Sequence, residues 1–265
     1  MGLSTFIGGV HPYEGKELSS DKPIQVIQPK GELVFPLSQH IGAPAKPLVA
    51  KGDTVLAGQK IAEAGGFISA NVICSVSGTV KGIEPRLMAN GSMVQSIIVE
   101  NDGEYRTVEG FGQKRDYTAF SKQEIRDIVK EAGIVGLGGA GFPTNVKLAP
   151  KNEEEIDYVI VNGAECEPYL TSDYRVMLEQ PEKVVGGLKV ILQLFDKAKG
   201  VIGIEENKPE AIRILSELVK DEPRIQVCTL KTKYPQGGER FLIYAVTGGR
   251  EINSTMLPAD AGCIV

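Results

Sequence analysis

The pattern of apolar and polar positions changes partway along the chain. Between residues 30 and 100, short apolar runs alternate with turn signals such as Gly65-Gly66 and Asn90-Gly91. Runs of this kind, bounded by Gly, Asn and Asp, predict β-strands at 32–35, 54–56, 72–74 and 96–100. Strands this short, with turns this dense, are typical of a small barrel or sandwich.

After a polar stretch at 101–119, the apolar spacing becomes helical. Ser121 and Glu124 form a capping-box pair ahead of an apolar face, and Gly133 is suited to end that helix. The rest alternates between strand and helix. Strands are predicted at 157–161, 200–204 and 225–230, and helices at 181–197, from Pro209 onward and at 238–246. Such alternation predicts a parallel sheet flanked by helices.

We therefore predict an α/β protein of two domains. Residues 1–110 are expected to form an N-terminal segment and the all-β domain, and residues 111–265 the parallel α/β domain. The polar, glycine-containing residues 101–119 are interpreted as the junction. A length of 265 residues fits one large domain or two ordinary ones.

Composition and charge exclude several classes of protein. Hydrophobic residues make up 42% and charged residues 24%, so the chain can bury a core. A net charge of −5 without a basic run argues against nucleic-acid binding. The sequence contains no apolar stretch near the ~18 residues that a membrane span requires. The 4 cysteines are widely spaced and only 2 histidines occur, so we expect no metal site in this chain.

The densest candidate for ligand binding is the loop Gly136-Leu-Gly-Gly-Ala-Gly-Phe-Pro-Thr144, which Lys147 follows. Its glycines let backbone N–H groups approach an anion, and the lysine can meet a phosphate as a point charge. The pattern matches neither the dinucleotide fingerprint nor the Walker loop. A tight structural turn without a ligand explains the glycines equally well.

A second candidate is Asn162-Gly-Ala-Glu-Cys-Glu-Pro168, at the carboxyl end of a predicted strand, where open α/β sheets bind ligands. Asn162 is suited to the edge of a planar heterocycle, and Glu165 and Glu167 can accept from ribityl or ribose hydroxyls. The pKa of Cys166, between two carboxylates, is expected to be raised, which makes this thiol a poor nucleophile. Solvated acidic loop residues are the alternative.

A third candidate is Tyr234-Pro-Gln-Gly-Gly-Glu-Arg240, between a predicted strand and a predicted helix. Its glycines and the start of the helix could cradle a phosphate or the edge of a ring. An ordinary strand-to-helix connection is the alternative.

The β-rich half has a more specific pattern. Val49-Ala-Lys-Gly-Asp-Thr-Val-Leu-Ala-Gly-Gln59, followed by Ser75-Val-Ser-Gly-Thr-Val80, resembles the barrel-sandwich hybrid of biotinyl and lipoyl domains. The hairpin that presents the modified lysine in those domains is missing from the sequence. We therefore expect a structural barrel without covalent biotin or lipoate.

Together, the three candidate motifs resemble the flavin- and NADH-binding subunit of respiratory complex I. Its patterns run G-R-G-G-A-G-F-P-T-G-x-K, N-A-D-E-x-E-P and Y-x-C-G-E-E, from which Leu137, Ala164 and Gly238 depart. Phe6-Ile-Gly-Gly-Val-His-Pro12 and the stretch from 162 to 174 indicate a nearer family. With the barrel segment, they resemble the RnfC family of the Rnf electron transport complexes over nearly the whole chain.

This resemblance implies a barrel-sandwich hybrid domain, a Rossmann-like α/β domain that binds FMN and NADH, and no catalytic proton donor. Electron transfer between NADH and ferredoxin, in a membrane complex that moves ions, is the implied activity. Contacts with NADH are implied for Phe142 and Glu167. Contacts with FMN are implied for Gly136, Gly138, Gly139, Lys147, Asn162, Glu165, Gly237 and Glu239.

The same resemblance implies partners and a location. We expect other members of the complex and ferredoxin, or another iron–sulfur carrier, as partners, with the protein peripheral on the cytoplasmic side of the cell membrane. Two 4Fe-4S clusters are expected beyond residue 265, so the chain is interpreted as a truncated, soluble and inactive part. A cobalamin reductase of the propanediol-utilisation type is the alternative enzyme, and a docking scaffold is the alternative without catalysis.

Overall fold

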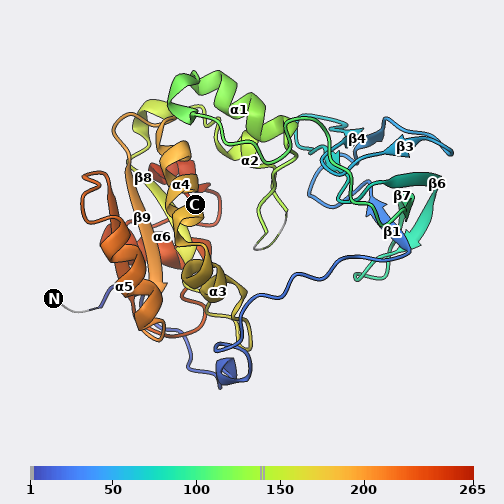
Figure 1. Cartoon of the computed structure of the whole chain (residues 1–265). Coiled ribbons are helices and arrows are strands. Elements are labelled where there is room, and N and C mark those ends of the chain that lie inside the picture. The colour runs from blue at the N-terminus through green and yellow to red at the C-terminus, as the bar shows by residue number, and fades with distance from the viewer. Residues whose placement is uncertain (1–2, 138, 140) are drawn as a thin grey trace. The chain divides into compact units, whose positions relative to one another are not determined.

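The computed structural model describes residues 3–137, 139 and 141–265 and divides into two compact units (Figure 1). The barrel unit is Ile27–Ala149. The α/β unit is Pro150–Val265 together with the N-terminal residues through Val26. These bounds differ from the predicted domains because the helical residues after 119 pack with the barrel and the N-terminal residues pack with the α/β unit.

The barrel unit contains two antiparallel sheets, with strand orders β1-β7-β6-β3 and β2-β4-β5. Their bounds are β1 Glu32–Pro36, β2 Lys46–Pro47, β3 Thr54–Val55, β4 Lys60–Glu63, β5 Val72–Ile73, β6 Gly78–Leu87 and β7 Met93–Asn101. The predicted strands all lie within this set or overlap it. Two small antiparallel sheets agree with the predicted small barrel or sandwich.

The inner faces of these sheets form an apolar core. Val55, Ile61, Ile97 and Val99 are at most 1% exposed and pack in one cluster. The first part of the predicted junction joins this core, because Tyr105 packs against it and the Ala57 amide donates to the carbonyl oxygen of Arg106 at 2.9 Å. Residues 109–116, by contrast, are exposed and irregular.

The barrel unit ends in short helical elements, η2 Tyr117–Ala119, α1 Lys122–Glu131 and α2 Thr144–Lys147. The predicted capping box is confirmed: the Glu124 amide donates to Ser121 Oγ, and the Ser121 amide donates to the Glu124 carboxylate. Gly133 has φ 65° and follows the helix, as predicted for the position that ends it.

The α/β unit is built on a parallel sheet with strand order β10-β9-β8-β11. Its strands are β8 Tyr158–Gly163, β9 Lys199–Glu205, β10 Ile225–Leu230 and β11 Cys263–Ile264. Its helical elements are η1 Lys16–Leu18, η3 Glu153–Glu155, α3 Ser172–Glu179, α4 Pro181–Leu192, α5 Pro209–Leu218, α6 Glu239–Thr247 and η4 Pro258–Ala261. The predicted parallel α/β architecture is confirmed.

Helices cover both faces of this sheet. A Cβ at Gly200 would lie 2.9 Å from Leu188 of α4, and one at Gly203 would lie 3.0 Å from Leu242 of α6. Because residues three apart along a strand point to opposite faces, α4 and α6 pack on opposite sides of β9.

Two helical bounds differ from the sequence prediction. Helix α4 ends at Leu192 rather than at residue 197. The carbonyl oxygens at and after this end accept hydrogen bonds of 2.5–3.2 Å from the Arg224 guanidinium; they belong to Leu192, Phe195 and Ala198. Helix α3 was not predicted. Of its side chains, Met177 is the buried one, so its apolar pattern is weak.

The order of the strands locates a binding crevice. Strands β9 and β10, which follow β8 in sequence, lie on one side of β8 in the sheet. Strand β11, which comes last in sequence, lies on the other side of β8. The strand order therefore reverses at β8 and β11, and ligands of open α/β sheets bind at the carboxyl ends beside such a reversal.

Candidate functional site

The three predicted motifs lie in different units. Gly136, Gly139, Phe142 and Lys147 belong to the barrel unit, and Gly138 lies outside the described residues. The predicted residues of the other two motifs belong to the α/β unit, where both motifs follow carboxyl ends of the parallel strands; they are Asn162, Glu165, Glu167, Gly237 and Glu239.

The glycine-rich loop is closed by backbone hydrogen bonds. The Gly136 amide donates to the carbonyl oxygen of Phe142 at 2.9 Å, and the Thr144 amide donates to that of Ile134 at 3.0 Å. Gly141 has φ 62°, and a Cβ there would lie 3.0 Å from the carbonyl oxygen of Gln39. Glycine is therefore required at position 141 by backbone conformation and by space.

The second and third motifs interlock at the carboxyl ends of β8 and β10. Asn162 Nδ2 donates to the carbonyl oxygen of Gly237 at 2.8 Å, and the Gly237 amide donates to Cys166 Sγ at 3.2 Å. A Cβ at Gly237 would lie 3.3 Å from Asn162 Oδ1, Ala164 Cβ and Cys166 Sγ. Glycine at 237 thus lets the two loops approach closely and leaves Asn162 exposed at the strand end.

Glu165 is a buried carboxylate in this arrangement, with 8% of its surface exposed and φ 48°. Its Oε1 accepts from the amides of Asp173 and Tyr174, in the first turn of α3, at 2.7 and 3.3 Å. Its Oε2 is buried and has no hydrogen-bond partner among the described residues. Burial raises the pKa of Glu165, and the two amides oppose that shift.

A buried ion pair lies beneath the same loop. Lys208 is 2% exposed and donates to the carbonyl oxygen of Ala164 at 2.7 Å, to Asn207 Oδ1 at 2.9 Å and to Glu205 Oε2 at 3.4 Å. Glu205 is 1% exposed. Burial lowers the pKa of Lys208 and raises that of Glu205. Removing such a pair of charges from water costs free energy, so a buried pair adds little to the net stability of the fold. Buried ionisable groups with shifted pKa values are often found at functional sites.

The third motif and the strand end before it add two more buried polar side chains. Gln236 is fully buried, its Oε1 accepts from Thr5 Oγ1 at 3.2 Å, and its Nε2 has no partner among the described residues. Lys233 donates to the carbonyl oxygens of Phe6 and Gly8 at 2.5 and 2.9 Å, and its ammonium lies 3.9 Å from the centre of the Phe6 ring.

Sequence reasoning missed Glu205, Lys208, Lys233 and Gln236. The available signal was their position, because each stands at the end of a buried apolar strand or in the loop that follows it. Polar residues there gather at the edge of a parallel sheet where ligands bind. Their burial could not be read from the local pattern.

The pKa of Cys166 is raised, as predicted, but burial is the largest cause, and the charges of Glu205 and Glu167 add to it. Glu167 raises the pKa of Tyr234 by its charge and by a hydrogen bond. The exposed Glu167 side chain therefore lies beside the third motif.

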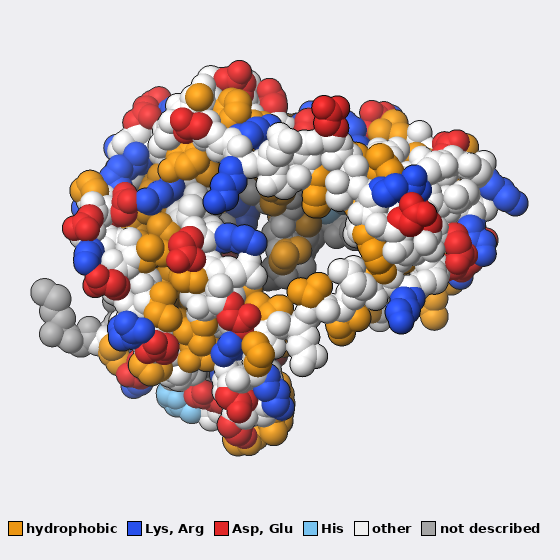
Figure 2. Space-filling model, viewed as in Figure 1, with side chains coloured by type: hydrophobic (Ala, Val, Ile, Leu, Met, Phe, Trp, Pro, Cys, Tyr) orange, Lys and Arg blue, Asp and Glu red, His pale blue; other side chains and the backbone are white. Residues whose placement is uncertain are grey.

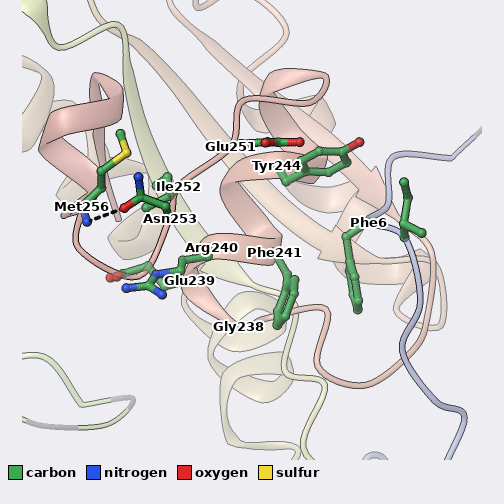
Figure 3. Close-up of a pocket in the computed structure, with 11 residues that line it drawn as sticks. Phe6, Gly238, Glu239, Arg240, Phe241, Tyr244, Glu251, Ile252, Asn253 and Met256 are labelled. Atoms are coloured by element: carbon green, nitrogen blue, oxygen red, sulfur yellow. Dashed lines mark hydrogen bonds between the residues drawn. The ribbon is translucent and has the colours of Figure 1, made fainter.

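A groove of about 990 Å³ opens beside the start of α6 (Figure 3). Glu239, Phe241 and Tyr244 of α6 line it together with Phe6, and Ile252, Asn253 and Met256 form the opposite wall. The Phe6 and Phe241 rings lie 4.5 Å apart at 31°. Phe6 is buried and Phe241 is 42% exposed. An exposed ring next to a carboxylate can accommodate a planar ligand with hydroxyl groups.

Figure 2 shows acidic and basic side chains interspersed over the face in view. Within residues 3–137, 139 and 141–265, we find no group of three or more His, Cys, Asp or Glu placed to hold a metal ion. Over the same residues, no helix is both long and apolar enough to span a bilayer.

Comparison with known families gives two matches that lie one after the other in the sequence. Residues 4–104 match the RnfC barrel sandwich hybrid domain. Residues 129–265 match the Nuo51 FMN-binding domain. The second match covers more than half of the chain.

Two curated relatives are similar to almost all of the chain. The C subunit of the proton-translocating ferredoxin:NAD(+) oxidoreductase complex of Clostridium ljungdahlii is 46% identical over 263 residues, which are 99% of this chain and 57% of the relative. The C subunit of the Na(+)-translocating ferredoxin:NAD(+) oxidoreductase complex of Acetobacterium woodii is 46% identical over 264 residues, which are 98% of this chain and 59% of the relative. The chain thus spans little more than half the length of these relatives.

A solved structure of an NAD+-reducing nickel–iron hydrogenase is 23% identical, with a TM-score of 0.45, and the match covers 56% of this chain and 29% of that chain.

Proposed function

The chain belongs to the RnfC family, with an RnfC barrel sandwich hybrid domain and a Nuo51 FMN-binding domain, and from this premise we propose that it binds FMN and NADH. Its role is to orient the flavin against the nicotinamide and to tune the flavin's electronic properties. FMN, when bound, supplies the chemistry that accepts a hydride and passes its electrons on singly.

One observation carries this proposal: of the three buried side-chain polar atoms without a partner among the described residues, two lie at the carboxyl edge of the sheet, and the third, Arg86 Nε, lies in the barrel unit. Glu165 Oε2 is an acceptor and Gln236 Nε2 is a donor, and both lack partners among the described residues. Asn162 stands exposed at the same edge, held by Gly237. Buried polar groups without partners are rare in native proteins, and a ligand with donors and acceptors along its edge fits such atoms.

The chain's own residues divide the work of holding the two ligands. Asn162, Glu165, Gly237 and Glu239 would bind the ring and ribityl chain of FMN. Residues Phe142 and Glu167 would bind the nicotinamide nucleotide. The phosphate of FMN would be held by the glycine-rich loop at Gly136, Gly138 and Gly139 and by the ammonium of Lys147.

The wider role rests on the relatives, whose names describe subunits of ferredoxin:NAD(+) oxidoreductase complexes. We propose that this chain is part of such an ion-translocating complex, with other subunits and ferredoxin as partners. Its place would be peripheral, on the cytoplasmic side of the cell membrane, and the complex as a whole would carry the activity. The 4Fe-4S clusters expected beyond residue 265 stay a prediction.

A fluorescence titration of FMN into the chain tests the proposal. Since charge-assisted bonds to a phosphate contribute about 1.5–3 kcal/mol, Lys147→Ala is expected to weaken binding roughly 10- to 150-fold. Lys51→Ala is the matched control, because Lys51 is an exposed lysine of the same unit. It is expected to bind FMN with unchanged affinity.

Two results would contradict the proposal at different levels. Equal affinities of the Lys147→Ala and unmutated chains would remove the phosphate role of Lys147. No FMN binding by the unmutated chain, together with none by a chain extended to the length of its relatives, would favour a docking scaffold over a flavin protein.

A further inference from the structure

The N-terminal segment, residues 4–20, lies along the loops that carry the candidate site. Ser4 pairs with Leu230 at the end of β10. Val10 and Tyr234 exchange backbone hydrogen bonds of 2.9 and 2.8 Å. The segment therefore extends the carboxyl edge of the sheet and reaches the loop 164–171 that follows β8.

The Lys16 ammonium of this segment donates hydrogen bonds to three carbonyl oxygens of that loop. Its ammonium donates to Leu170 at 2.6 Å, to Glu165 at 2.8 Å and to Glu167 at 3.0 Å. An ammonium has three N–H donors, so these contacts use all of them. Three carbonyl dipoles that converge on one point repel each other unless a cation lies between them.

The loop has a conformation that needs such support. Glu165 and Tyr169 have φ of 48° and 66°, a region that side chains other than glycine and asparagine seldom occupy. Both lie within the stretch whose carbonyl groups Lys16 binds. The cation thus offsets the strain of these two residues and fixes the direction of the backbone between them.

Other contacts of the same segment hold the far end of the loop. The Tyr169 amide donates to the carbonyl oxygen of Glu14 at 2.7 Å. The Tyr169 ring covers Gly15, where a Cβ would lie 2.4 Å from it. Ser19 Oγ and Thr171 Oγ1 lie 2.8 Å apart and share a hydrogen bond.

A second lysine holds the start of the loop from within the sheet. Lys208 binds the carbonyl oxygen of Ala164 and the side chain of Asn207. Asn207 Nδ2 in turn donates to Glu14 Oε2 at 2.9 Å. The loop is therefore held between two cations, Lys208 under its first residue and Lys16 under residues 165–170.

We propose that Lys16 is a positioning residue of the flavin and nucleotide site, which sets the backbone of residues 165–170 and thereby the places of Glu165 and Glu167. This inference rests on the proposed function, because it concerns the same site. Lys16 itself is not expected to touch either ligand, since its three donors are used by the loop.

The test compares Lys16→Met with Lys22→Met in the full chain. Methionine keeps an unbranched stem of similar length but removes the cation. Lys22 lies in the same N-terminal region, and its ammonium donates to the Leu18 carbonyl oxygen. Hydrogen exchange of the 165–171 amides is expected to be faster in Lys16→Met. FMN affinity, measured where circular dichroism shows every variant folded, is expected to fall roughly 10-fold. The Lys22→Met variant is expected to match the unmutated chain in both readouts.

A merely structural role would predict a different result: a lower unfolding temperature with unchanged FMN affinity in the folded chain. That result, or unchanged exchange of the loop amides, would overturn the inference. Lys16→Arg keeps a cation with several donors and is expected to restore both readouts; an arginine variant as impaired as Lys16→Met would also overturn it.

If neither the unmutated chain nor a chain extended to the length of its relatives binds FMN, the proposed function fails, and the ligand role of Lys16 fails with it. The exchange measurement still shows separately whether Lys16 orders the loop.

Discussion

The two units bury different kinds of polar group. In the barrel unit, buried Ser69, Asn71 and Ser77 are neutral, and each makes at least two hydrogen bonds. In the α/β unit, by contrast, the buried polar groups include two carboxylates and two ammonium groups; they are Glu165, Glu205, Lys208 and Lys233. These charged groups all follow, or end, the parallel strands at the carboxyl edge of the sheet.

This difference separates structural burial from functional burial. Neutral hydroxyl and amide groups with partners cost little to bury, so Ser69, Asn71 and Ser77 need no explanation beyond the fold. Buried charges cost several kcal/mol each to desolvate, and apolar residues of similar size often serve stability as well or better. Their concentration at one edge of the α/β unit therefore points to a ligand rather than to stability.

The largest expected effect comes from removing one buried charge. Lys208→Met leaves Glu205 and the Ala164 carbonyl oxygen without their cation, and breaking a buried pair in this way costs about 3–5 kcal/mol. Denaturant unfolding, followed for the α/β unit, measures the loss. Lys81→Met is the matched control in the barrel unit, because Lys81 is 49% exposed in its pairs with Glu32 and Glu100. It is expected to change stability little, and similar losses for both variants would remove the contrast between the units.

A smaller effect is expected from trimming the apolar cores, and here the two units should behave alike. Ile97 of β7 and Ile202 of β9 are both fully buried. Ile→Val at either position removes one methylene group and is expected to cost about 0.5–1.5 kcal/mol. Unfolding of the two variants measures this. A clear difference between them would show that the units differ in their cores as well as at the carboxyl edge.

The buried carboxylates of the α/β unit and Asp102 of the barrel unit are expected to contribute pH dependences of opposite sign. Burial raises the pKa of Glu165 and Glu205 above the ~4.3 of an unfolded glutamate. The folded α/β unit then binds more protons than the unfolded one between that value and the raised pKa, so its stability falls as pH rises through this window. The unfolding temperature of the α/β unit is expected to increase as the pH is lowered from neutral toward ~4.5. Glu205→Gln should flatten this dependence, and an unchanged slope would contradict the assignment.

The barrel unit contains the opposite case. Hydrogen bonds from Ser77 and Arg106 lower the pKa of Asp102 to about 2. A lowered pKa stabilises the folded state above the unfolded value of ~3.9, and this contribution is lost as pH falls toward the folded value. The unfolding temperature of the barrel unit is therefore expected to decrease as the pH is lowered below ~4. Asp102→Asn should weaken this dependence of the unfolding temperature on pH. Parallel pH profiles for the two units would contradict this difference in sign.

The smallest expected effect is a cut that leaves both units folded. We propose that the chain can be cut within residues 101–119 without unfolding either unit; these residues lie inside the barrel unit, between β7 and α1, and residues 109–116 among them are exposed and irregular. Brief trypsin treatment is expected to cut first after Lys114 or Arg115 and to give two resistant fragments. Early cuts within residues 122–250 would contradict the proposed division.

The regular elements could be predicted largely from local pattern. The Ser121 and Glu124 pair indicated the start of α1, and apolar runs located β8, β9 and β10. Helix α3 was not predicted because its start depends on a contact with a residue outside the helix. Glu165 accepts hydrogen bonds from the amides of its first turn. The end of α4 was not predicted correctly because Arg224, far along the chain, donates hydrogen bonds to the carbonyl groups at that end.

Periodicity and motifs were enough to identify the two kinds of sheet, the order of the elements and the family, because these depend on spacing along the chain. The candidate residues Asn162 and Gly237 could be named in the same way, since strand ends and glycine-rich turns are local features. Which side chains are buried there, and with what partners, depends on how distant segments pack. Lys16 lies 149 residues from Glu165, and nothing in the spacing brings its ammonium to three carbonyl groups of that loop. These contacts follow from the packing of the N-terminal segment along the sheet edge, and no local pattern specifies packing between segments so far apart.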